Sequence, residues 1–157
     1  MTASHPYTPR HREILTAALR LVAERGLAAA SLRELARRVS ISQPSLYHYF
    51  TSKDELVEQV ITDYTADLLE NTIAPPGAPP TALRELLQHI VNRLLVVWSR
   101  PIHADFVRFM FAVTMEKPEY GELLRRNLLD RAAQLVEPLM GPIVCRGDVL
   151  ECDARFV

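Results

Sequence analysis

The sequence is poor in cysteine and glycine and has no long apolar run. Its 157 residues include only Cys145 and Cys152, too few for a disulfide framework and consistent with a reducing compartment. No apolar run approaches the roughly 20 residues that a membrane-spanning helix needs. No basic segment followed by an apolar stretch marks a secretory signal at the N-terminus. These absences predict a cytoplasmic protein that does not bind membranes.

Sequence features of enzymes are also missing. We find no Gly-rich phosphate loop, no nucleophile paired with a base, and no cluster of metal ligands among the five scattered histidines. Cys145 and Cys152 are seven residues apart, but Gly147 and its polar neighbours interrupt any helix that would join them. Two ordinary thiols are therefore favoured, with a redox or metal pair as the alternative. We expect no enzymatic activity, no cofactor and no metal.

Charge is divided unevenly along the chain. Hydrophobic residues make up 48% and charged residues 24%, which is typical of a soluble globular protein of one domain or two small ones. The net charge is −1, yet residues 1–53 hold eight arginines and lysines against three acidic residues. The other ten basic and sixteen acidic residues lie in 54–157. A basic N-terminal part suggests a polyanionic partner, although many solvated helices carry a similar excess.

The apolar periodicity is helical almost throughout and predicts an all-α fold. Helices are expected at about 9–25, 32–39, 43–50, 53–73, 81–99, 102–116 and 119–140. Ser31 and Ser52 each begin a capping box, and Gly26 supplies a left-handed stop after the first helix. The Pro-rich stretch 74–80 reads as a linker, and Gly141-Pro142 is expected to end the last helix.

Two short helices separated by Ser40-Ile41-Ser42 are typical of a helix-turn-helix. The first is apolar on one face and basic on the other, although a solvated face is the favoured reading for Arg37 and Arg38. The second must present small polar groups at its N-terminal end, because that end enters the major groove of DNA. A glutamine there can pair with adenine through two hydrogen bonds. The candidates are Ser42, Gln43, Pro44 and Ser45, followed by Tyr47, His48, Tyr49 and Lys53.

Residues 14–56 resemble the TetR-type transcriptional regulators. The similarity lies in AALRLVAERG at 17–26, SLRELA at 31–36, VSIS at 39–42 and LYHYFTSKDEL at 46–56. It implies that Gln43, Pro44 and Tyr47 face the bases and that Arg33 also reaches a base. Phosphate contacts are implied for Ser31, Ser45, His48, Tyr49 and Lys53. Ser31 and Ser42 could cap their helices, contact DNA, or do both.

The resemblance also implies that the acidic part of the chain binds a small inducer and forms a dimer. The expected ligand-binding residues are Leu94, Val97, Trp98, His103, Phe106, Phe109, Met110, Phe111 and Met115. For any single one of them, ordinary core packing between helices is the alternative. His103 follows a helix start, where a histidine is more often satisfied locally than used by a ligand.

The predicted organisation is a three-helix DNA-binding domain at 1–52 and a helical ligand-binding and dimerisation domain at 53–157. The helix at 53–73 connects them. Family members usually end in two further helices that form a four-helix dimer interface, and residues 153–157 look like the start of the first. We therefore expect those helices to be missing, or the dimer to use the helices at 102–116 and 119–140.

The expected function is a ligand-responsive repressor. It would bind a near-palindromic duplex operator as a dimer and be released by a small, largely apolar inducer. One alternative is a ligand-independent regulator of the same fold, which would lack a cavity of several hundred Å³. Another is a helical small-molecule-binding or scaffolding protein without salt-dependent binding to duplex DNA.

Overall fold

The computed structural model describes residues 8–74 and 82–145, and every regular element in these ranges is an α-helix. The helices are α1 (Pro9–Arg25), α2 (Leu32–Arg38), α3 (Gln43–Leu46), α4 (Lys53–Ile73), α5 (Leu83–Trp98), α6 (Pro101–Glu116) and α7 (Glu119–Cys145). The predicted all-α fold is confirmed. Within the described ranges, no helix combines the length and apolar character needed to cross a bilayer.

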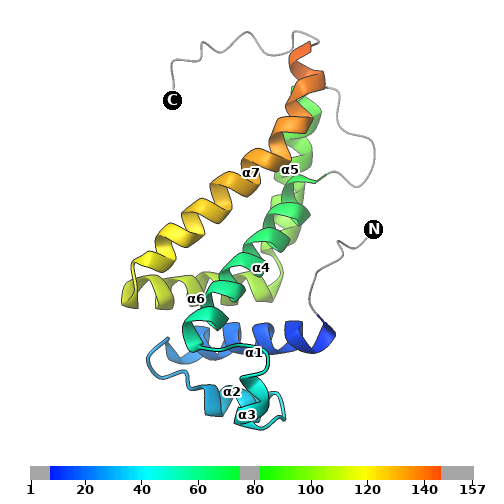
Figure 1. Ribbon diagram of the computed structural model, residues 1–157. Helices are drawn as coiled ribbons and strands as arrows, with labels where there is room; N and C mark the ends of the chain where they lie inside the picture. The colour runs from blue at the N-terminus through cyan, green and yellow to red at the C-terminus, as the bar shows by residue number, and fades with distance from the viewer. Residues whose placement is uncertain (1–7, 75–81, 146–157) are drawn as a thin grey trace.

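The helices form a small head and a long body. Helices α1, α2 and α3 lie at one end of the molecule, and α6 lies across α1 (Figure 1). Helix α4 leaves the head and runs along the body, where it packs against α5 and α7 (Figure 1). Because α4 belongs to both parts, it is the continuous connection between them.

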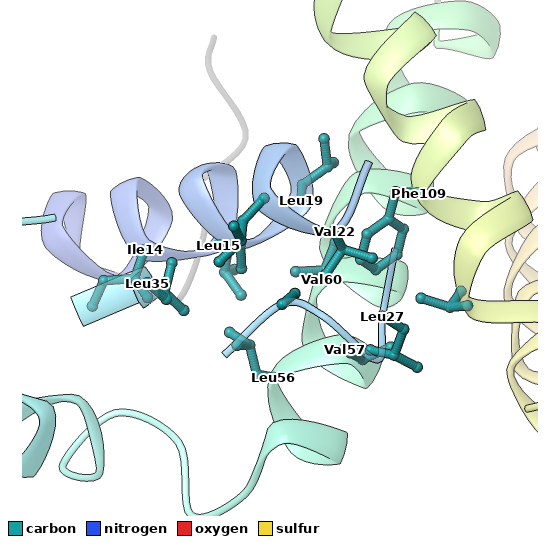
Figure 2. Close-up of a cluster of buried hydrophobic side chains, with 14 of the residues drawn as sticks. Ile14, Leu15, Leu19, Val22, Leu27, Leu35, Leu56, Val57, Val60 and Phe109 are labelled. Carbon is teal, nitrogen blue, oxygen red and sulfur yellow. The ribbon is translucent and has the colours of Figure 1, made fainter. Parts of the chain in front are cut away.

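A hydrophobic cluster joins the head to α6. It contains Ile14, Leu15 and Leu19 of α1, Leu35 of α2, Leu56, Val57 and Val60 of α4, and Phe109 of α6 (Figure 2). Phe109 is fully buried and lies close to Val22, so it fills the space between α1 and α4 (Figure 2). The aromatic side chain of one body helix thus completes the core of the head.

A second cluster lies at the far end of the body. Ile73 of α4, Leu86 of α5, and Leu139 and Ile143 of α7 are buried together there. This cluster holds the three long helices together where α4 and α7 end. The first cluster therefore includes residues of both predicted domains, because α6 contributes Phe109 and Val113 to it.

Three local predictions need correction. Helix α3 ends at Leu46 rather than near Phe50. After Leu46 come backbone hydrogen bonds with three-residue spacing, as from Tyr47 N to Pro44 O at 3.1 Å, which make a tighter turn than an α-helix. This turn brings Phe50 into the core. Helix α7 continues past Gly141 to Cys145, and the burial of Ile143 stabilises this last part of the helix. Gly26 has the expected positive φ of 80°, but its ψ of 162° is extended.

We predict that Phe109→Ala destabilises the protein by about 3–5 kcal/mol, because it leaves a cavity between α1 and α4. The control is Phe111→Ala, two residues along the same helix, whose side chain is 68% exposed. It should change the free energy of unfolding by no more than about 0.5 kcal/mol. Urea unfolding followed by circular dichroism measures both. Equal losses in the two variants would contradict this view of the core.

Candidate DNA-binding interface

Side-chain caps set the positions of α2 and α3. The hydroxyl oxygen of Ser31 accepts a hydrogen bond from Glu34 N (3.1 Å), and that of Ser42 accepts one from Ser45 N (3.1 Å). Ser52 caps α4 in the same way through Glu55 N (3.0 Å). The capping roles predicted for these serines are therefore confirmed. The hydroxyl groups of Ser31 and Ser52 can still donate to a second partner, whereas the Ser42 hydroxyl also shares a hydrogen bond with the Ser45 hydroxyl at 2.7 Å.

The turn between α2 and α3 is held from both sides. Ser40 adopts a φ of 54°, in the left-handed region that non-glycine residues seldom occupy. The next amide, Ile41 N, donates to Ala36 O at 2.9 Å, which closes the end of α2. Leu46 and Phe50 are each 1% exposed and anchor α3 in the core. These two buried side chains give α3 a fixed orientation on the head.

The structure brings most of the predicted DNA-binding residues to the surface of the head. Seven of them are exposed: Ser31, Arg33, Ser42, Gln43, Pro44, Tyr47 and His48. Ser45, Tyr49 and Lys53 are half-buried. Gln43 and Pro44 form the first turn of α3, and Tyr47, 48% exposed, directly follows its end. A polar, accessible face therefore surrounds the N-terminal end of α3.

Tyr49 has structural contacts as well as accessibility. Its ring lies 6.0 Å from the ring of His11 in an edge-on arrangement and 6.4 Å from that of Phe50. His11 in turn contacts Gln59 Oε1 through its Nε2 at 2.8 Å. These contacts tie the segment after α3 to both α1 and α4. Packing thus accounts for the Tyr49 ring, and a phosphate contact remains a prediction for its hydroxyl.

Several basic residues of the head are already partnered. Arg38 lies 2.7 Å from Glu24 and 3.6 Å from Glu34, and its hydrogen bond lowers the pKa of Glu24. Lys53 donates a hydrogen bond to the carbonyl oxygen of Leu27, although an ammonium has two further donors. Arg33 and Arg37 are exposed, and neither forms an ion pair with any described residue. Their charge is the most available one on this face.

A half-open, almost wholly apolar pocket of about 300 Å³ lies in the body. It is lined by Leu68, Trp98, Phe106, Val107, Met110, Phe111, Thr114, Leu124 and Leu128. Four of the predicted ligand-binding residues are among these: Trp98, Phe106, Met110 and Phe111. The prediction missed the contributions of α4 and α7, because a stripe on one helix does not reveal which other helices face it.

The other five predicted ligand-binding residues lie elsewhere. Leu94 and Met115 are on the surface, with 37% and 83% of their side chains exposed. Val97 and Phe109 are fully buried, and Phe109 packs in the core of the head. His103 is 2% exposed and does not line the pocket; burial lowers its pKa and thus favours the neutral ring. Cys152 and the side chain of Cys145 lie outside the described residues.

Comparisons with known proteins agree with this arrangement. Residues 14–60 match the family model of bacterial regulatory proteins of the tetR family. The transcriptional repressor KstR2 of Mycolicibacterium smegmatis is 41% identical over 63 residues, which are 40% of this chain and 30% of that protein. The transcriptional regulator BetI of Burkholderia mallei is 26% identical over 88% of this chain and 81% of its own length. The match to KstR2 thus spans less than a third of that relative.

Solved structures share the fold at low sequence identity. The regulator SCO7518 of Streptomyces coelicolor A3(2) superposes with a TM-score of 0.65 at 23% identity, covering 85% of this chain and 78% of that one. The fatty acid degradation regulator FadR of Bacillus halodurans gives 0.67 at 16% identity, covering 94% and 74%. These likenesses show the fold, and within it residues 14–60, the helix-turn-helix region, match the model of the tetR family of bacterial regulatory proteins.

Proposed function

We propose that this chain is a transcriptional repressor that binds a near-palindromic duplex operator as a homodimer and is released by a small apolar molecule. The observation that carries the proposal is the exposure of Gln43, Pro44 and Tyr47 around the N-terminal end of α3. This is the part of a helix-turn-helix that enters the major groove. The name of KstR2, a transcriptional repressor, supports repression as the output.

The chemistry of this face suits duplex DNA. The Gln43 amide can donate to N7 and accept from N6 of adenine, which distinguishes one base pair. Arg33 and the hydroxyl groups of Ser31, Tyr47 and Tyr49 can contact phosphates or base edges. Lys53 lies at the start of α4, where the free backbone N–H groups also favour a phosphate. Base reading is thereby proposed for α3 together with Arg33, and positioning for the other residues around α3.

Ligand response is supported by the two faces of α6. On one face, Phe109 and Val113 are buried in the core of the head. On the other, Val107 and Phe111 line the pocket. A molecule in the pocket therefore contacts the helix on which the head rests. If it binds better to one position of α6 than to another, it shifts the population of head orientations.

The test of DNA binding is selection of bound duplexes from a random pool, followed by sequencing. We expect two related half-sites whose centres lie about 34–36 Å apart, or slightly more, on the duplex. Affinity for the selected duplex should fall by orders of magnitude between about 50 mM and 200 mM salt, because phosphate contacts release counterions. Binding that selects no sequence, or that ignores salt, would refute the proposal.

We predict that Gln43→Ala relaxes the preference at a single base position in each half-site. The expected cost there is about 1–3 kcal/mol, the discrimination that two hydrogen bonds to one base provide. Gln88→Ala, which changes an exposed glutamine of α5, is the matched control and should leave the selected sequence unchanged. An unaltered base profile for Gln43→Ala would show that α3 does not read bases through this residue.

We predict that filling the pocket abolishes ligand response while DNA binding remains. A screen of small apolar molecules against the protein–operator complex, with Trp98 fluorescence reporting occupancy, identifies a releasing compound. Val107→Phe should then remove its effect, which for linked sites is about 5- to 150-fold in affinity. Val91→Phe makes the same change on the exposed face of α5 and should preserve the response. Release that survives in Val107→Phe would place the ligand elsewhere, and absence of any releasing compound would favour a ligand-independent regulator.

A further inference from the structure

A polar cluster connects the start of α4 to the turn between α6 and α7. Asp54 Oδ1 accepts hydrogen bonds from Lys117 Nζ at 2.7 Å and from the Tyr120 hydroxyl at 2.8 Å. The two donors lie 63 and 66 residues further along the chain. We call these three side chains the Asp54 cluster. It is a contact between the segment that follows the recognition helix and the body.

The Asp54 cluster differs from an ordinary surface ion pair because one of its members, Tyr120, is buried. Tyr120 is only 3% exposed, and its ring belongs to the core that also contains Val57 and Phe109. The Lys117 ammonium lies 5.6 Å from the centre of that ring. Both donors lower the pKa of Asp54, while burial raises that of Tyr120, so carboxylate and protonated phenol persist together. The buried ring fixes where its hydroxyl points.

The two donors are also fixed relative to each other. Only Lys117 and Pro118 separate α6 from α7, and Tyr120 N donates to Lys117 O at 3.1 Å. Lys117 is the C-terminal cap residue of α6, and its amide donates to Val113 O at 2.8 Å. The turn therefore presents both groups to Asp54 as one unit, and that unit continues directly into the helix that lines the pocket.

Asp54 occupies a sensitive place in the head. It follows Lys53 and lies two residues after Ser52, the cap that begins α4 directly after the segment from α3. Within the head, α1 and α4 are joined by the hydroxyls of Thr16 and Tyr64, 2.8 Å apart. Asp54 therefore lies close in sequence to α3, on a helix that is bonded to α1. A change in the position of Asp54 would move α4 and the rest of the head together.

We propose that Tyr120 and Lys117 are positioning residues that, through Asp54, fix the orientation of the recognition helix and so the half-site spacing that the protein accepts. The proposal rests on the proposed function, since it assumes binding to paired half-sites. A head held at both α6 and Asp54 presents α3 at one angle. A head freed at Asp54 samples several angles, and ordering it on DNA costs affinity.

The experiment repeats the random-duplex selection with the full-length Tyr120→Phe variant. This change removes only the hydroxyl and leaves the ring in the core. We expect the distribution of half-site spacings to broaden, with the base preference inside each half-site unchanged. Affinity for the duplex that the unaltered protein prefers should fall by about threefold to tenfold, the effect of one lost hydrogen bond. Lys117→Met should act in the same direction, and Lys117→Arg should restore the narrow distribution.

The matched control is Glu122→Gln, which breaks the exposed ion pair between Glu122 and Arg125 (2.6 Å) on the same turn of α7. It should leave the spacing distribution unchanged. Partial unfolding would weaken binding at every spacing equally, so broadening separates positioning from stability. A distribution in Tyr120→Phe as narrow as in the unaltered protein would overturn the inference while leaving DNA binding intact. Selection of isolated half-sites by the unaltered protein would overturn it too, whereas failure to select any duplex would refute the proposed function itself.

Discussion

The contact between α6 and the head is the constraint on which the other features depend. Phe109 and Val113 are both fully buried, and they complete a core that α1 and the two short helices α2 and α3 could not close alone. A head of only three helices buries too little apolar surface to be very stable on its own. The side chains of α6 that pack into its core add the buried apolar surface that it lacks. The same contact makes the orientation of the proposed DNA-binding face depend on the position of α6.

Local features of this structure were readable from the sequence. A serine three residues before a glutamate predicts a helix start, and Ser31 and Ser52 both cap as that pattern requires. Proline at 9 and 101 marks helix starts within a residue or two of the expected position. The exposure of Gln43 and Tyr47 was also expected, and it arises because Leu46 and Phe50 are the side chains buried on α3 and on the segment after it. Each of these rests on neighbours within about one helical turn.

Contacts distant in sequence were not predictable in the same way. The apolar stripe of α6 contains both Phe109 and Phe111, and nothing in its spacing says which of them faces α1 and which the pocket. Leu68 and Leu124 line the pocket only because α4 and α7 happen to approach there. The Asp54 cluster likewise joins residues more than sixty positions apart. Such partners depend on how helices cross, which periodicity within one helix does not specify.

The count of basic residues in the head does not by itself give the charge that its surface presents. Arg10 donates to the carbonyl oxygen of Val39, at the end of α2, and Lys53 donates to that of Leu27, in the loop before α2. Both cations thus hold the backbone on either side of α2, the helix that precedes the turn. Neither is thereby withdrawn from DNA, since a guanidinium has five N–H donors and an ammonium three. A carbonyl partner, unlike a carboxylate, also leaves the positive charge of Lys53 uncompensated. Lys53 therefore adds to the field of Arg33 and Arg37, whereas Arg10, paired with Glu13 at 2.6 Å, and Arg38, paired with two glutamates, contribute little.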